Sequence, residues 1–245
     1  MALPKIETPT YDLTLPSKDE KIEFRPFTVK EEKILMIASE SEDDNEIFRA
    51  VTKVIDECTF KKLESRTLPL FDIEYIFLKI RAKSVGEVTK FRVLCPDDHK
   101  TYTEVEIDLS GVEVHVDDDH TNKIILNKQK NLGVVFAYPT LDVAKVSKNL
   151  TDAKTEDIFE IIYSCVDHIF EGDKIYPAKD TSRDELVEFF ESLSQENLVD
   201  IRKFFDSMPQ LKHEVEVENP KTKVKSMITF RGLSDFFSYA SPTVT

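Results

Sequence analysis

The sequence predicts an α+β fold in which helical N-terminal and C-terminal blocks flank a small antiparallel sheet, with a β-hairpin near the C-terminus. Three observations predict it. Apolar residues recur at helical spacing over residues 28–86 and 141–208. They alternate with polar residues between positions 87 and 138, and again on both sides of the turn at 219–222. Hydrophobic residues make up 40% of the 245 residues, which is enough to build a core.

The N-terminal block begins with a predicted hairpin and a capped helix. Residues 11–25 contain two short alternating runs separated by a polar stretch, which is typical of a β-hairpin. Thr28 and Glu31 have the spacing of a capping box, so a helix is expected to begin there and to continue to about Ser39. Ile34, Leu35 and Ile37 are expected to form its apolar side.

Two further helices complete this block. Apolar residues between Ile47 and Cys58 have helical spacing, and an acidic stretch precedes them at the positive end of the helix dipole. After Pro69 the chain is apolar on most sides of a helix, as expected for a helix at the centre of a core. Gly86 is placed to end that helix.

Strands are predicted next. The run 87–138 is expected to form one small antiparallel sheet with one face toward solvent. Its alternating apolar residues are Phe91, Val93 and Cys95, then Val105, Ile107 and Leu109, then Val112, Val114 and Val116.

The C-terminal block is predicted to be helical and to end in a hairpin. Residues 158–172 show apolar side chains on one helical face and a glycine at the end. Ser182 and Glu185 form a second capping box, which opens a helix that is followed by another, ending before Pro209. Three segments are therefore expected, at 1–86, 87–140 and 141–245, within one domain or several.

Composition excludes several classes of function. Only five glycines are present and none lie close together, so no phosphate-cradling loop is expected. The net charge is −14 and no third of the chain is basic, so no nucleic-acid partner is expected. Three scattered cysteines, with no signal peptide and no membrane-spanning run, lead us to expect a soluble protein of a reducing cytoplasm.

No catalytic site, metal site or cofactor is predicted, although three groups of residues have side chains of the required kinds. Cys95-Pro96-Asp97-Asp98-His99 resembles a zinc knuckle with Asp98 in place of the second cysteine, and an ordinary turn is favoured. The run 117–120, three aspartates and a histidine, has the residue types of a metal-dependent hydrolase but reads as a solvated loop. Cys165 and His168 are three residues apart on an expected helix, where a buried, inert thiol is favoured.

Adjacent phenylalanines are the strongest sign of a binding function. The pairs at 189–190, 204–205 and 236–237 put large apolar areas on neighbouring faces of helices. One ring of each pair can face the core while the other faces outward, and exposed aromatic rings favour protein interfaces. The predicted partner-binding residues are Leu233, Phe236, Phe237, Phe189 and Phe190.

Specific sequence blocks carry a family resemblance. Residues 25–36 (RPFTVKEEKILM) and 71–86 (FDIEYIFLKIRAKSVG), together with the opening Leu3-Pro4 and Pro9-Thr10-Tyr11 and the ending 232–237 (GLSDFF), resemble the baseplate hub assembly proteins of T4-like tailed bacteriophages. The likeness covers most of the chain.

The resemblance implies a role in tail assembly rather than in catalysis. It implies a viral late protein that acts as a non-enzymatic assembly factor, or chaperone, for the central hub of the baseplate. Its partners would be hub and spike proteins and other hub assembly factors, in the host cytoplasm. The alternative is a structural hub subunit that stays in the virion tail.

Overall fold

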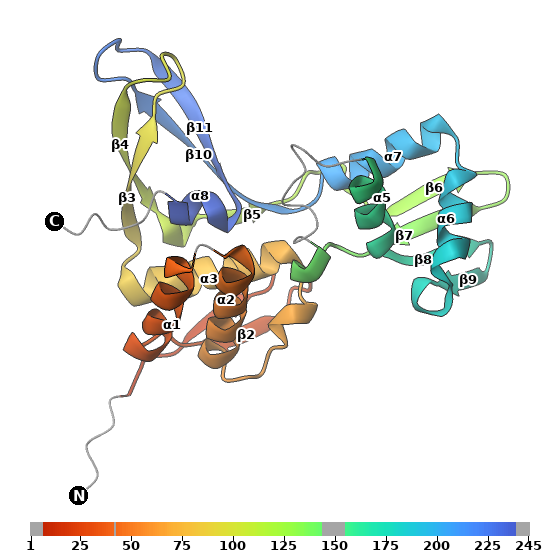
Figure 1. The fold of residues 1–245 in the computed structure, drawn as a ribbon, viewed down its shortest axis with the longest axis horizontal. Helices are drawn as coiled ribbons and strands as arrows, with labels where there is room; N and C mark the ends of the chain where they lie inside the picture. Colours follow the sequence, from red (N-terminus) through yellow and green to blue (C-terminus); the bar gives the residue numbers. More distant parts are fainter. Residues whose placement is uncertain (1–6, 42, 144–154, 239–245) are drawn as a thin grey trace, which may run out of the picture. The chain divides into compact units, whose positions relative to one another are not determined.

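The computed structural model describes residues 7–41, 43–143 and 155–238, and the chain forms two compact units (Figure 1). Unit 1 comprises residues 1–115 and 210–245, and unit 2 comprises residues 116–209. Both units mix helices with antiparallel strands, which confirms the α+β class. The units do not follow the three expected segments, because the C-terminal hairpin returns to unit 1, where it pairs with a strand of the first half of the chain.

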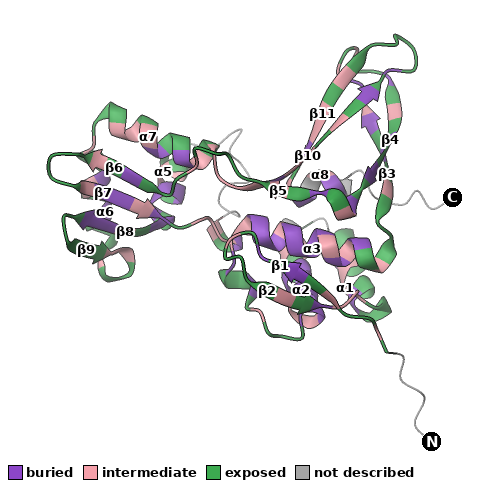
Figure 2. Ribbon diagram, turned by 180° about the vertical axis from the view of Figure 1, so that it is seen from behind, coloured by how far each residue is buried: buried purple, intermediate pink, exposed green. Residues whose placement is uncertain are grey.

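The helical part of unit 1 matches the expectation closely. Strands β1 (Tyr11–Thr14) and β2 (Lys21–Phe24) form the predicted hairpin, followed by α1 (Val29–Glu40), α2 (Asp44–Cys58), the short 3-10 turn η1 (Ser65–Thr67) and α3 (Leu70–Val85). Helix α3 is buried along most of its length, as Figure 2 shows, because its apolar residues occur on nearly every side.

The remaining strands of unit 1 form two hairpins. Strands β3 (Val88–Leu94) and β4 (Tyr102–Asp108) make one, and β10 (Gln210–Glu218) and β11 (Lys225–Arg231) make the predicted C-terminal one. The 3-10 turn η2 (Leu109–Gly111) leads to β5 (Glu113–His115), which pairs with β10, and α8 (Gly232–Ser238) ends the described chain. Figures 1 and 2 show the two hairpins side by side.

Unit 2 is a four-stranded sheet with helices packed on one face. The strands β6 (Lys123–Asn127), β7 (Leu132–Phe136), β8 (Val166–Glu171) and β9 (Lys174–Pro177) are adjacent in that order and antiparallel. The helical elements are α5 (Thr155–Ser164), the 3-10 turn η3 (Ala178–Asp180), α6 (Arg183–Glu191) and α7 (Gln195–Asp206). Buried residues of β6, β7 and β8 pack against apolar residues of α5, α6 and α7 to form the core.

Two expectations about secondary structure are wrong. The strands of 87–138 belong to three different sheets, because β5 pairs with β10 and β7 pairs with β8. The helix expected over 158–172 ends at Ser164, and the chain continues as β8. A short apolar run fits helix and strand equally well, and pairing with β7 decides for the strand. Gly172, with φ +59°, makes the turn to β9.

Candidate partner-binding surfaces

Helix α1 exposes apolar side chains on the face that points away from the core. Val29 is 78% exposed, Met36 is 59% exposed and Ile37 is 55% exposed. Val29 and Met36 are seven residues apart, so they lie two turns apart on one face of the helix. The opposite face contains Glu31 and Ala38, which are also seven residues apart and are buried. Helix α1 is therefore packed through the side that carries Glu31 and Ala38, while apolar residues of its other side stay exposed.

An ion pair between a buried carboxylate and a partly buried guanidinium fixes the orientation of α1. The guanidinium of Arg25 lies 3.1 Å from the carboxylate of Glu31, which also accepts hydrogen bonds from the backbone N–H (2.8 Å) and the hydroxyl (2.6 Å) of Thr28. Burial alone would raise the pKa of Glu31, but the hydrogen bonds from Arg25 and Thr28 and the charge of Arg25 lower it to about 2. This arrangement turns Glu31 inward and the face with Met36 outward.

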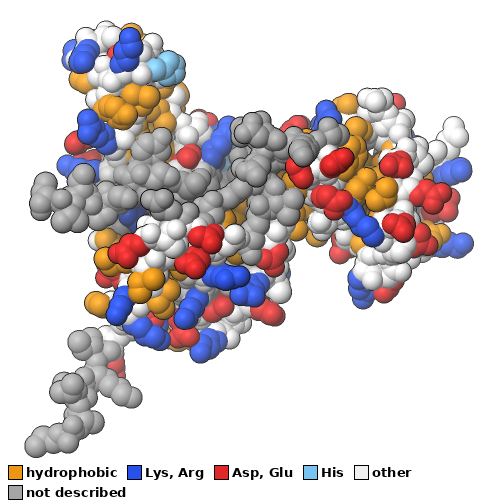
Figure 3. All heavy atoms as spheres, viewed as in Figure 1, with side chains coloured by type: hydrophobic (Ala, Val, Ile, Leu, Met, Phe, Trp, Pro, Cys, Tyr) orange, Lys and Arg blue, Asp and Glu red, His pale blue; other side chains and the backbone are white. Residues whose placement is uncertain are grey.

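We name the exposed residues Val29, Met36 and Ile37 the α1 face. Its polar neighbours carry both signs of charge: by helical spacing, Lys33 and Glu40 lie within the face, and Lys30 and Glu32 lie at its two edges. Figure 3 shows hydrophobic side chains among Lys, Arg, Asp and Glu over the helical part of unit 1. Exposed apolar residues with a polar surround are typical of protein interfaces. The sequence placed Ile37 on the inner side of α1, which is wrong.

The C-terminal residues predicted to bind partners are instead part of the core of unit 1. Phe236 is 0% exposed, and its ring centroid lies 5.6 Å from that of Phe230 and 6.3 Å from that of Phe91. Leu233 is buried as well, and its backbone N–H donates to Glu74 (3.1 Å). The expected exposure of Leu233 and Phe236 is therefore wrong, because α8 folds back against α3 and the β10–β11 hairpin. The side chain of Phe237 lies outside the described residues.

The predicted pair on α6 divides as expected, with one ring inside and one at the surface. Phe190 is buried and packs edge-on against Tyr163, with centroids 5.4 Å apart, and against Phe136. Phe189 is half-buried, and its ring meets that of Phe190 at 81°. Phe189 therefore keeps part of its surface available to a partner, whereas Phe190 holds α6 to the sheet.

Cys165 and His168 do not lie on one helix, as the sequence suggested, because the helix ends before them. Cys165 lies at the junction of α5 and β8, and burial raises the pKa of its thiol to about 12. His168 lies on β8, where its Nδ1 is 2.6 Å from the carboxylate of Asp167. A thiol with so high a pKa is protonated at neutral pH and is a poor nucleophile.

The histidine of the 117–120 run is held by ring contacts and hydrogen bonds within unit 2. Nδ1 of His120 is 2.9 Å from the hydroxyl of Ser207, and Nε2 is 3.0 Å from that of Tyr138. The imidazole also stacks on Tyr138 and Phe204. Burial lowers the pKa of His120, while the charge of Asp117 opposes that shift. These contacts anchor the segment between β5 and β6 to the end of α7.

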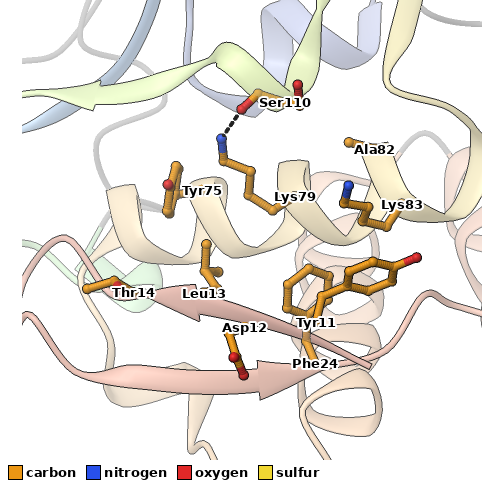
Figure 4. A pocket seen from close by; sticks show the side chains of 10 residues that line it. All are labelled: Tyr11, Asp12, Leu13, Thr14, Phe24, Tyr75, Lys79, Ala82, Lys83 and Ser110. Atoms are coloured by element: carbon orange, nitrogen blue, oxygen red, sulfur yellow. Dashed lines mark hydrogen bonds between the residues drawn. The ribbon is translucent and has the colours of Figure 1, made fainter. Parts of the chain in front are cut away.

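A cavity of about 410 Å³ in unit 1 lies between the β1–β2 hairpin and α3 (Figure 4). Lys79 and Lys83 line it together with Tyr11 and Asp12. The ammonium of Lys79 donates to the carbonyl of Ser110 (2.6 Å), and the ammonium of Lys83 lies 5.0 Å from the centre of the Tyr11 ring. The lining residues of this cavity include neither His nor Cys.

Within residues 7–41, 43–143 and 155–238, no three His, Cys, Asp or Glu side chains are grouped so that they could hold a metal ion. Over the same residues, no helix has both the length and the apolar character needed to cross a bilayer.

Both units expose apolar side chains, such as Met36 and Ile37 in unit 1 and Ile175 and Val199 in unit 2. Comparison with protein families gives the identity: residues 8–238 match the model of the family described as T4 bacteriophage base plate protein. The match covers most of the chain, so the protein belongs to this family of phage baseplate proteins. Comparisons with curated proteins and with solved structures find no significant match.

Proposed function

We propose that this baseplate protein is a non-enzymatic assembly factor, a chaperone for the central hub, that binds other baseplate proteins through the α1 face. The observation that carries the proposal is the exposure of Val29, Met36 and Ile37 on a helix whose other side is already packed. Membership of the baseplate family supports phage tail proteins as the partners. We place its action in the host cytoplasm, where tails are assembled, with hub and spike proteins and other hub assembly factors as partners.

The proposal assigns no catalytic residue, metal or cofactor. It is supported by the buried thiol of Cys165 and by the hydrogen bonds that hold His120 to Tyr138 and Ser207. Phe189, which is half-buried on α6, is proposed as a second contact, on unit 2.

The main test is co-purification with the hub proteins of the same phage. The variant Met36→Gln with Ile37→Gln removes apolar area without touching the inner side of α1. Because central interface residues often contribute more than 1 kcal/mol each, we expect affinity for a hub protein to fall by about tenfold or more. The matched control is Ile175→Gln with Val199→Gln, at positions of similar exposure in unit 2 (62% and 51%).

Circular dichroism would show that both variants remain folded. Equal loss of binding in both variants, or full binding by the α1 variant, would refute the α1 face as the site.

A structural hub subunit is the rival proposal, and virion content distinguishes the two. An assembly factor is expected to be present in infected cells and absent from purified virions, whereas a subunit is retained at a fixed copy number. Mass spectrometry of purified tails measures this directly. Retention at a fixed copy number would overturn the assembly-factor proposal but not the α1 face.

A further inference from the structure

The two hairpins of unit 1 end in turns of the same design. One turn begins at Cys95 and the other at Asn219, and a proline follows each. In the first, the N–H of His99 donates to the carbonyl of Cys95 (3.0 Å), and in the second the N–H of Lys223 donates to that of Asn219 (2.9 Å). The fifth residue is left-handed in both, with φ +51° at His99 and +62° at Lys223.

The first residue of each turn is also placed alike. Cys95 and Asn219 are each 1% exposed. The N–H of Cys95 donates across its hairpin to the carbonyl of Thr101 (2.8 Å), and the N–H of Asn219 donates to that of Val224 (2.9 Å). Each turn therefore directs its first side chain inward while the turn itself closes the end of a hairpin.

Two tight turns of this kind that face each other form the backbone arrangement of a zinc ribbon site. In such a site each turn supplies two cysteines separated by two residues, and the four thiolates hold one ion in a tetrahedron. The corresponding positions here are 95 and 98 in one turn and 219 and 222 in the other. They carry one cysteine, Cys95, and the oxygen-bearing residues Asp98, Asn219 and Thr222.

Hydrogen bonds join the two turns directly. The carboxylate of Asp97 accepts from the amide of Asn219 (2.9 and 3.1 Å) and from the hydroxyl of Thr222 (2.6 Å). The amide oxygen of Asn219 accepts from the backbone N–H groups of Lys221 and Thr222. The carboxylate of Asp98 accepts from Thr101 within its own turn.

We propose that the hairpin tips are a two-knuckle site in which hydrogen bonds to Asp97 take the place of a structural metal ion, with the four ligand positions still facing one another. The carboxylate of Asp97 accepts hydrogen bonds from both Asn219 and Thr222, so one side chain of the first turn holds two residues of the second. Hydrogen bonds, rather than bonds from thiolates to a metal ion, therefore join the end of the β3–β4 hairpin to the end of the β10–β11 hairpin. The inference is independent of the α1 face.

Restoring the cysteines tests the geometry. In the full chain, Asp98→Cys, Asn219→Cys and Thr222→Cys together with native Cys95 would give four thiols, which release their protons when a metal binds. Titrated with Co²⁺ alone, this variant is expected to bind one ion per chain with the absorption of tetrahedral thiolate coordination, and Zn²⁺ should displace it. The matched control carries Cys95→Ser as well and is expected to lose that spectrum.

Two results would overturn the inference from this experiment. One is a folded triple variant without the tetrahedral spectrum, and the other is a control variant with the same spectrum as the triple variant.

A second variant keeps the proposal testable if the triple variant does not fold. Asp97→Ala removes the carboxylate that accepts hydrogen bonds from Asn219 and Thr222, and it leaves the other residues of both turns unchanged. Because the hydrogen bonds of Asp97 hold the two turns together, amide exchange at 95–101 and 219–224 is expected to rise about tenfold or more. Exchange in unit 2 should not change, and Asp173→Ala in the exposed β8–β9 turn is the control. Unaltered exchange at the tips would overturn the proposal.

Discussion

The ion pair of Arg25 and Glu31 makes a prediction about acid stability that can be worked out from the structure. Glu31 is buried, and its pKa falls from the usual 4.5 to about 2. A shift of this size favours the charged carboxylate in the folded state by about 3 kcal/mol. A lowered pKa gives stability that is present above pH 4.5 and is lost as the pH falls through about 2.

The perturbation is Glu31→Gln, which keeps an oxygen that can accept from the N–H of Thr28 but removes the negative charge beside Arg25. At neutral pH we expect unit 1 of the variant to be less stable than the native protein by about 3 kcal/mol, the lower end of the range of about 3–5 kcal/mol measured when one partner of a buried pair is removed. Near pH 3 the difference in unfolding free energy between the native protein and the variant should shrink to about 1 kcal/mol, because the Glu31 carboxyl of the unfolded chain is then mostly protonated.

The assay is urea unfolding of the full chain, followed by pulsed hydrogen exchange within residues 29–58, so that unit 1 is measured separately from unit 2. The matched control is Glu32→Gln, the exposed neighbour of Glu31 on α1. Equal stability of Glu31→Gln and native protein at neutral pH, or a difference that does not shrink in acid, would refute the reasoning.

Three further predictions concern packing and titration. Gly133→Ala should destabilise unit 2 by about 1–3 kcal/mol in urea unfolding, because a Cβ there would lie 2.4 Å from the ring of Phe170 and 2.5 Å from the carbonyl oxygen of Ile124; an unchanged midpoint would contradict this. Phe236→Ala should lower the unfolding free energy of unit 1 by about 3–5 kcal/mol in urea unfolding, because the ring of Phe236 is fully buried. A decrease below about 1 kcal/mol would argue against that burial. Because burial lowers the pKa of His120, unit 2 should lose stability as the pH falls below about 6.5, and His120→Gln should reduce that loss; identical pH profiles would count against the shift.

Local sequence signals identified most helices and hairpins correctly. The capping boxes at Thr28 and Ser182 mark the starts of α1 and α6, because a side chain three residues along reaches back to the helix start. The apolar run after Pro69 identified α3 as a core helix. These features depend on residues a few positions apart, so the sequence contains the information directly.

Long-range pairing decided what the local pattern left open. Residues 166–171 form a strand because β7 supplies the partner, although their apolar spacing also fits a helix. The return of β10 to β5 joins residues 210–245 to unit 1, and no local signal marks that boundary.

The candidate partner-binding surfaces also depend partly on local sequence and partly on long-range contacts. The sequence by itself determined that the chain is acidic, poor in glycine and rich in paired phenylalanines, and it carried the resemblance to phage baseplate proteins. Only the tertiary structure decided which apolar residues are covered: Phe236 is enclosed by Phe91 and Phe230, while Met36 remains exposed. The physical reason is that burial depends on contacts between residues far apart in the chain, which hydrophobicity at a single position does not specify.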